Sequence, residues 1–115
     1  NLIILDNPQY FYGPKKKYCE HFEAIELIQN LFINKKCYLI FNINKKPFNI
    51  DKLSDWEIKR NEYYGFNSRD IKSKKIILFY KNKFKKLGYI VYDCFEQKRN
   101  SEYLSYLVLA LKKKV

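Results

Sequence analysis

The sequence has no methionine, and its 115 residues include only three glycines, three prolines, three cysteines and one histidine. So few glycines and prolines leave little room for linkers, and a chain of this length predicts one domain. Because methionine is absent, we expect that the N-terminal end was trimmed, either by removal of a transit peptide or by excision from a larger protein.

The cysteines and the histidine are too few and too scattered for the common metal sites. Cys19, Cys37 and Cys94 are odd in number and have no paired spacing, which argues against a disulfide framework or a zinc site and favours a reducing compartment. His21 shares the apolar face of a predicted helix, so we expect a hydrogen-bonded core or boundary residue. No phosphate-binding glycine loop and no serine nucleophile is recognisable, so the sequence predicts neither catalysis nor a cofactor.

Long hydrophobic runs are also missing. The longest, at 103–111, is far shorter than the roughly 20 residues that span a bilayer, so we expect no membrane span. Acidic residues number 12 against 23 basic ones, which gives a net charge of +11. Such an excess favours a polyanionic partner, either nucleic acid or an acidic membrane surface. The alternative is an incidental excess, since the abundance of Lys, Asn, Ile, Tyr and Phe is typical of an AT-rich genome.

Hydrophobic periodicity predicts alternating strands and helices. The expected elements are a strand at 1–6, a loop at 7–17, a helix at 18–33, a strand at 37–43 covered on both faces, a loop at 44–53, a helix at 54–64, a turn at 65–68, a helix at 71–87, a strand at 89–94 and a final helix at 101–114. Ser54 and Glu57 have capping-box spacing, and Gly88 marks a helix end. This pattern predicts an α/β fold, with a small mixed sheet flanked by helices.

The helix at 71–87 is the most informative element. Its predicted buried stripe consists of Ser73, Ile77, Tyr80, Phe84 and Leu87, which recur at helical spacing. Lysines lie off that stripe. Leu78 and Phe79 also fall outside it, which predicts a second buried face against another element or a partner.

Basic residues interleaved with aromatic ones are typical of surfaces that bind phosphates and stack on unpaired bases. The candidate nucleic-acid contacts are Lys15, Lys16, Lys17, Lys45, Lys46, Tyr63, Tyr64, Arg69, Lys72, Lys75, Lys83 and Lys86. The alternative is a solvated helix face with core aromatics, since at 18% aromatic content most rings must be core.

Two carboxylates end predicted strands, where α/β proteins form their sites: Asp6 and Asp93. Neither has an acidic neighbour in sequence, so a strand-end hydrogen-bonding role is favoured over metal binding. The tripeptide at 57–59, Glu-Ile-Lys, matches the Glu-x-Lys of metal-dependent nucleases, but it follows a helix cap instead of lying on a strand.

The stretch KFKKLGYIVYDCFE at 83–96, followed by SEYLSYLVLAL at 101–111, resembles the C-terminal half of the RAP domain. In that family a basic helix ends in Leu-Gly-Tyr or Leu-Gly-Trp, a strand follows, and a Tyr-Leu helix closes the domain. Here Leu87, Gly88 and Tyr89 occupy the first motif, and Tyr103 and Leu104 occupy the second.

The family's other hallmark is a strand that reads roughly Ile-Glu-Val-Asp-Gly-Pro-x-His-Phe. Residues 3–11 keep its Asp as Asp6, its Pro as Pro8 and its Phe as Phe11, with Ile4 in place of the Glu. Residues 41–48 have more ordinary spacing, with Asn42 for the Glu and Asn44 for the Asp. Both registers stay open, and the first keeps more of the family's residues.

The resemblance implies a restriction-endonuclease-like fold and a role in RNA processing or translation in mitochondria or plastids. The family is abundant in apicomplexan parasites, whose AT-rich codon bias fits this composition. Because the family's Glu is missing in both registers, the resemblance implies a nuclease-like shape in which Asp6 and Asp93 are vestigial.

These expectations combine into one functional hypothesis, a catalytically inactive RNA-binding domain of an organellar RNA-processing or ribosome-associated protein. Its partner would be ribosomal RNA or an organellar transcript, with other proteins of a ribonucleoprotein assembly. Two alternatives stay open: a structural subunit of an organellar ribosome or other assembly, and a metal-dependent nuclease that uses Asp6 or Asp93.

Overall fold

The computed structural model describes residues 2–6, 11–28, 35–45, 55–99, 101 and 103–114, with residue 16 described by its backbone only. The elements are β1 (Leu2–Leu5), β2 (Phe11–Tyr12), the 3-10 turn η1 (Pro14–Lys16), β3 (Tyr18–Cys19), α1 (Phe22–Ile28), β4 (Cys37–Asn44), α2 (Asp55–Tyr64), α3 (Ser73–Lys86), β5 (Tyr89–Lys98) and β6 (Leu104–Lys113). The predicted α/β class, with a small mixed sheet and helices packed against it, is confirmed.

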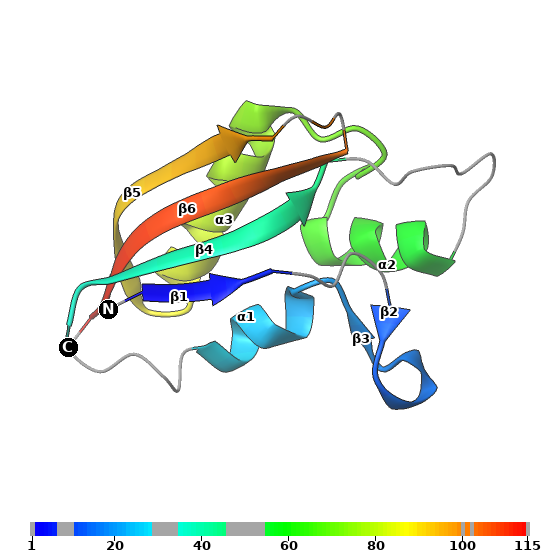
Figure 1. Cartoon of the computed structure of the whole chain (residues 1–115), viewed down its shortest axis with the longest axis horizontal. Helices are drawn as coiled ribbons and strands as arrows, with labels where there is room; N and C mark the ends of the chain where they lie inside the picture. Colours follow the sequence, from blue (N-terminus) through cyan, green and yellow to red (C-terminus); the bar gives the residue numbers. More distant parts are fainter. Residues whose placement is uncertain are drawn as a thin grey trace.

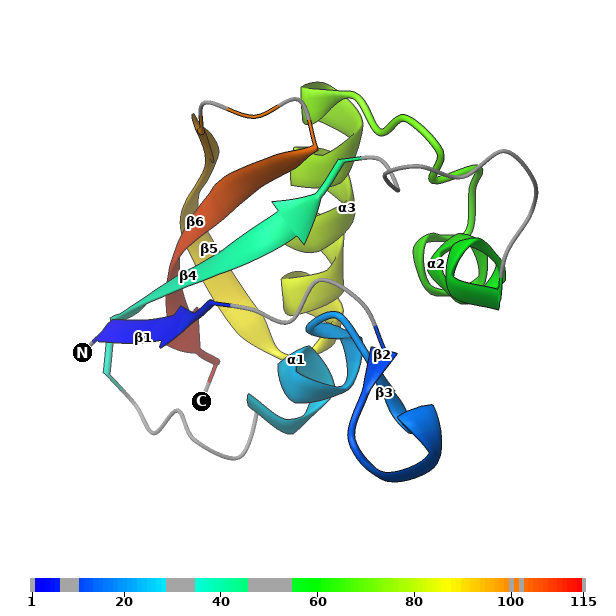
Figure 2. The same ribbon diagram turned by 45° about the vertical axis from the view of Figure 1, so that its right-hand side comes forward.

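The main sheet has four strands in the order β1-β4-β6-β5. β1 pairs with β4 in parallel, whereas β6 is antiparallel to both of its neighbours. Figures 1 and 2 show α1 and α3 against one face of this sheet, and none of the described helices lies on the other face. β2 and β3 form a separate two-stranded ladder that projects beside α1.

The core lies between the sheet and these helices. β4 contributes alternate buried side chains from Cys37 to Ile43, and β6 contributes three buried leucines and Ser105, which are paired with them. α3 adds Ile76, Tyr80 and Phe84, which are all at most 1% exposed. The predicted stripe on this helix is therefore partly corrected: Ile76 lies in the core, while Ile77, one position on, is half-buried.

β4 is the central strand that its apolar sequence predicts, but the expectation that both of its faces are covered holds only for its second half, where Asn42 and Asn44 are at most 3% exposed. Tyr38 is 49% exposed on the face opposite the helices. The first half of β4 is apolar on both faces, but among the described residues nothing covers Tyr38 on the face away from the helices.

The helix predicted at 18–33 is shorter than expected. Tyr18 and Cys19 instead form β3, paired with β2. Glu20 then has a φ of 49°, in the left-handed region that a continuous right-handed helix cannot include. α1 therefore starts at Phe22, and its predicted end at residue 33 lies outside the described residues.

The predicted final helix is wrong, because this segment forms strand β6. Leucines at 104, 107 and 111 match a helical period, but the buried residues alternate along the strand from Ser105 to Leu109, and Ala110 and Leu111 are buried as well. Ser101 does accept hydrogen bonds from the backbone N–H groups of Tyr103 and Leu104, at 3.1 and 3.2 Å. This resembles a helix cap, but here it shapes the connection between two strands.

Candidate nucleic-acid interface

α3 forms a lysine-rich ridge on the side of the molecule away from the sheet. Its 14 residues include six lysines and no acidic residue. Lys74, Lys85 and Lys86 are exposed, and within the described part of the chain they have no carboxylate partner. Three of the six lysines lie in the last turn, where the helix dipole favours positive charge. No acidic side chain within α3 therefore offsets the positive charge of its lysines.

A surface hollow lies between this ridge and α2. We call it the α2–α3 hollow. It has a volume of about 380 Å³ and is lined by Tyr63, Tyr64, Phe79, Asn82, Lys83 and Lys86. Four of these six residues are sequence-predicted contacts that come from two separate helices. The structure thus brings part of the predicted site together.

Aromatic rings form a rigid wall for the α2–α3 hollow. Tyr63 stacks on Phe22 with ring centroids 3.9 Å apart, and Phe79 meets the Tyr64 ring edge-on at 4.9 Å. The Tyr64 and Tyr80 hydroxyls are hydrogen-bonded at 3.1 Å. Burial raises the pKa of Tyr63, Tyr64 and Tyr80, so these phenols stay neutral. The wall is therefore uncharged and can pack against an aromatic ring such as a base.

The two lysines of the hollow differ in how firmly they are held. Lys83 forms an ion pair with Glu26, and its ammonium lies 5.1 Å from the centroid of the Tyr63 ring. Lys86 is exposed and unpaired among the described residues. One lysine is fixed beside the rings and the other can move to meet an anion.

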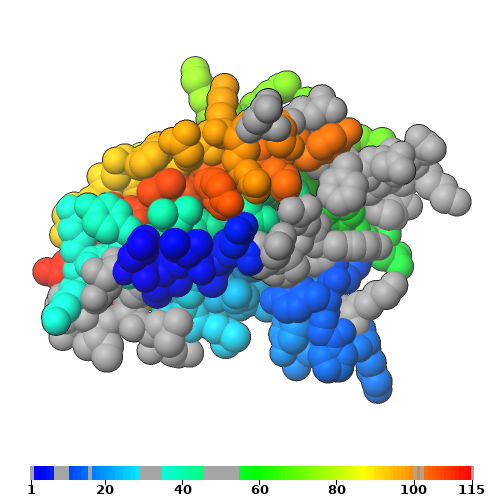
Figure 3. All heavy atoms as spheres, viewed as in Figure 1, coloured from blue at the N-terminus to red at the C-terminus, as the bar shows by residue number. Residues whose placement is uncertain are grey.

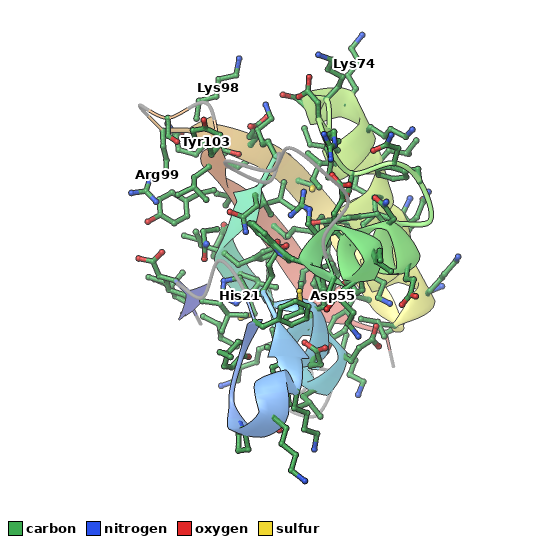
Figure 4. All side chains as sticks on the ribbon, turned by 90° about the vertical axis from the view of Figure 1, so that its right-hand side faces the viewer. His21, Asp55, Lys74, Lys98, Arg99 and Tyr103 are labelled. Atoms are coloured by element: carbon green, nitrogen blue, oxygen red, sulfur yellow. The ribbon has the colours of Figure 1, made fainter. Side chains whose placement is uncertain are left out.

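A second hollow, of about 210 Å³, lies where β5 and β6 join near the start of α3. It is lined by Lys45, Glu96, Lys98, Arg99, Ser101, Leu104 and Ser105. Lys45 is held between the Glu96 carboxylate at 3.1 Å and the Ser73 hydroxyl at 3.1 Å. Figure 4 shows Lys98 and Arg99 at this end of the molecule, close to Tyr103.

Lys98 and Arg99 are exposed basic residues that sequence reasoning missed. The signal was present as a dibasic pair just before the polar connection between β5 and β6, but the segment looked like an ordinary loop. Burial acts to raise the pKa of the nearby Glu96 carboxyl, but the neighbouring Ser73 and Ser105 hydroxyls and the Lys45 ammonium outweigh that effect and lower it. The ionised Glu96 thus neutralises Lys45 and leaves the exposed pair as the available cations.

Several predicted contacts are already engaged within the protein. Tyr64 is only 4% exposed. Arg69 donates two hydrogen bonds, of 2.7 and 3.1 Å, to the carboxylate of the buried Glu57. Glu57 is the glutamate of the Glu-x-Lys tripeptide, and here it fixes the loop that carries Arg69. Lys72 lies 3.2 Å from Asp70, and Lys75 lies 4.1 Å from the centroid of the Phe66 ring. Both of these lysines keep an exposed position on the ridge.

The remaining predicted basic contacts lie elsewhere. Lys15 and Lys17 belong to the β2–β3 hairpin, on the far side of α1 from the ridge (Figure 1). The Lys17 ammonium lies 5.4 Å from the centroid of the Tyr18 ring. The side chain of Lys16 and the whole of Lys46 lie outside the described residues.

The two vestigial carboxylates do not share a site. Asp6 follows β1 and Asp93 lies on β5, which are the opposite edges of the sheet, three strand spacings or roughly 14 Å apart. Asp6 accepts a 3.3 Å hydrogen bond from the Tyr106 hydroxyl, and Asp93 accepts one from the Cys94 N–H group. No group of three or more His, Cys, Asp or Glu side chains able to hold a metal occurs in the described ranges.

His21 and the cysteines have structural roles. His21 is buried, and its Nε2 lies 2.5 Å from Asn42 Oδ1, which confirms the expected hydrogen-bonded core histidine. All three cysteines are free, and burial raises the pKa of Cys19 and Cys94 to about 12. Thiols with so high a pKa are poor nucleophiles at neutral pH.

The fold and the ridge define a small mixed α/β protein with a lysine-rich helix beside an aromatic hollow. Comparisons of the chain with protein-family models, curated proteins and solved structures found no match. None of the helices in the described ranges is long and apolar enough to cross a membrane.

Proposed function

We propose that this chain is a non-catalytic RNA-binding protein that contacts RNA through the α3 ridge and the α2–α3 hollow. The observation that carries the proposal is the meeting of Tyr63 from α2 with Phe79, Lys83 and Lys86 from α3 around one hollow. Aromatic rings beside lysines are the combination by which proteins hold single-stranded nucleic acid.

Each part of this surface has a distinct task. The ridge lysines contact phosphates and displace counterions, which gives affinity without sequence preference. Phe79, which is half-buried in the wall of the hollow, offers a ring on which an unpaired base stacks. The Asn82 amide carries both donors and an acceptor that can pair with a base edge. An unpaired RNA segment therefore suits the site better than a duplex, whose bases are already stacked.

The resemblance to the RAP domain extends the proposal to a cellular setting. It supports an organellar RNA-processing or ribosome-associated protein, in the matrix of a mitochondrion or plastid, with a restriction-endonuclease-like fold. The RNA would then be ribosomal RNA or an organellar transcript. Asp6 and Asp93, on opposite sheet edges, lend no support to a shared nuclease metal site.

A structural subunit of an organellar ribosome or other assembly is the second candidate. It is favoured by large apolar side chains that stay exposed on the open face of the sheet, including Tyr92 at 52% and Phe95 at 44%. In that case the positive charge would be incidental and RNA binding would be weak and non-saturable.

The test is fluorescence anisotropy with a labelled single-stranded RNA across a salt series. Wild type is compared with a double variant of two exposed ridge lysines, Lys85→Ala with Lys86→Ala, and with a charge-matched control, Lys15→Ala with Lys17→Ala. We expect saturable binding whose logarithmic salt slope falls by roughly 0.7 for each phosphate that a removed lysine no longer neutralises, and so by about 1.4 in the ridge variant. The hairpin control should change the slope much less.

Circular dichroism checks that each variant folds. Absence of saturable binding at physiological ionic strength would contradict the proposal and favour the structural subunit. RNA cut in the presence of Mg²⁺ would contradict the non-catalytic assignment.

A further inference from the structure

The face of the sheet opposite the helices, which we call the open sheet face, carries a large share of apolar side chains together with a few polar and charged ones. The strand registers place Phe95 of β5, Val108 of β6, Ile40 of β4 and Ile4 of β1 in one row across all four strands. None of these four side chains is charged or polar. Figure 3 shows the four strands side by side on this face.

The open sheet face is larger than an incidental patch. Six large apolar side chains on this face are between 39% and 59% exposed: Leu2, Ile4, Tyr38, Ile90, Tyr92 and Phe95. Half-exposed side chains of this size present on the order of 100 Å² each, or about 600 Å² together. That is at the upper limit for a monomer's largest apolar patch, and close to the roughly 800 Å² that each partner buries in a stable interface.

We propose that a second copy of this chain covers the open sheet face, so that two sheets pack face to face about a two-fold axis. Charged side chains of both signs lie among the apolar side chains of this face. Asp93 neighbours Ala110 in the register, while Lys112 is paired with Ile90 on the same face. Because a two-fold axis presents the same face to itself, the acidic groups of one copy can meet the basic groups of the other.

RNA is a poorer occupant of this face. The ring of Tyr92 is already approached by the Lys36 ammonium, 4.7 Å from its centroid, and that of Tyr106 by the Arg99 guanidinium at 4.9 Å. Cations that cover these rings leave less room for a stacked base. The aliphatic residues Leu2 and Ile4 at the β1 edge offer neither charge nor a ring.

The net charge of +11 opposes pairing, but its densest cluster is on the far side of the fold. The α3 ridge lies behind the sheet in Figure 1, so the sheet itself separates the ridge from the open sheet face. The Debye length is about 8 Å at physiological ionic strength, so repulsion between the two ridges is screened. The net charge therefore does not prevent pairing through the open sheet face, whereas RNA binding on the ridge weakens as salt rises.

The test is analytical ultracentrifugation of the wild-type chain from low to high micromolar concentration, at physiological and at raised salt. We expect the mass to rise with concentration from 14.1 kDa towards twice that value at both salt concentrations. A chain that stays at 14.1 kDa throughout would overturn the proposal.

Variants locate the interface. Ile4→Lys and Phe95→Lys each bring an unpaired charge into the apolar row, and we expect each to weaken dimerisation at least about tenfold. Leu78→Lys is the matched control, since Leu78 on α3 is 59% exposed, close to the 57% of Ile4. Tyr38→Ser, which introduces no charge, serves if a lysine variant fails to fold by circular dichroism. A dimer that Leu78→Lys disrupts and the sheet variants leave intact would place the interface elsewhere.

The oligomeric state is read without RNA, so this proposal and the RNA-binding proposal fail separately. A dimer formed in this way leaves both ridges facing outwards on opposite sides. Two ridges on one particle would allow bivalent contact with a long RNA.

Discussion

The guanidinium of Arg60 and the carboxylate of Glu20 meet at 2.7 Å in the protein interior, where Arg60 is 0% and Glu20 3% exposed. Arg60 also donates to the backbone carbonyl groups of Asn44 at 2.7 Å and Ser68 at 3.1 Å. The Trp56 indole N–H donates to the same carboxylate oxygen at 2.9 Å. This ion pair therefore connects α2 to the end of β4 and to the turn before α1, and it positions the wall of the α2–α3 hollow.

Breaking this ion pair should be strongly destabilising. Removing one partner leaves the other buried and uncompensated, so we expect Glu20→Gln or Arg60→Met to lower the free energy of unfolding by roughly 3–5 kcal/mol. Urea denaturation measures the change. The control is Asp70→Asn, which breaks the exposed pair with Lys72 and should cost at most about 1 kcal/mol. Equal effects at the two sites would contradict the structural role of the buried pair.

Stability should fall on mild acidification because of His21. Burial lowers the pKa of this imidazole, although the Asn42 hydrogen bond and the nearby Glu20 and Asp6 act to raise it. Below the ordinary histidine pKa of about 6.5 the unfolded chain therefore binds a proton that the folded chain resists, so the free energy of unfolding decreases as the pH falls.

We expect His21→Gln to flatten this dependence between about pH 7.5 and pH 5.5, above the range in which carboxylates titrate. Thermal or urea unfolding across that window tests the assignment. An unchanged slope in the variant would show that another group is responsible.

Gly13 should be the glycine least tolerant of substitution. Its φ of 82° and ψ of 175° lie in a region that is almost restricted to glycine. An added Cβ would also lie 2.7 Å from Cδ2 of Tyr18, whose ring packs against Tyr12. Gly65 has a φ of 78° but open space around it. We expect Gly13→Ala to cost at least about 1 kcal/mol more than Gly65→Ala in unfolding experiments. Equal losses of unfolding free energy in the two variants would contradict this prediction and show that the β2–β3 hairpin shifts to accommodate the added Cβ.

The wall of the α2–α3 hollow should matter for RNA affinity. Loss of a stacking ring costs roughly 1–3 kcal/mol of binding, so we expect Phe79→Ala to weaken binding of single-stranded RNA about tenfold or more. Leu78→Ala is a control at the adjacent position, because Leu78 is 59% exposed and does not line the hollow. If both variants bind RNA equally well, base stacking does not occur in this hollow.

Local patterns predicted most of the chain but not the edges of its elements. The basic helix ending at Gly88, the strand after it and the central strand β4 all follow from spacing and turn residues. β6 did not, because a strand in the middle of a sheet can be apolar at almost every position and then also satisfies a helical period. Its pairing with two distant strands is a tertiary property that no window of sequence contains.

The candidate site shows the same division. Lysines and aromatics on α2 and α3 could be chosen from sequence, but which of them meet depends on how the two helices pack. Sequence reasoning could not foresee that Arg69 would be held by Glu57, or that Tyr64 would be buried, because both partners come from other segments. The exposure of the open sheet face was not predicted either, because a strand that is apolar at almost every position is expected to be buried on both faces.

The most direct measurement of the central claim is an NMR titration of ¹⁵N-labelled protein with unlabelled single-stranded RNA, which reports where the RNA lies. We expect the largest chemical-shift changes at Asn82, Lys83 and Lys86 and in the last turn of α2, and little change at Phe95 and Val108 on the open sheet face. Shifts confined to the open sheet face, or no saturable shifts at all, would contradict RNA binding at the α3 ridge and the α2–α3 hollow.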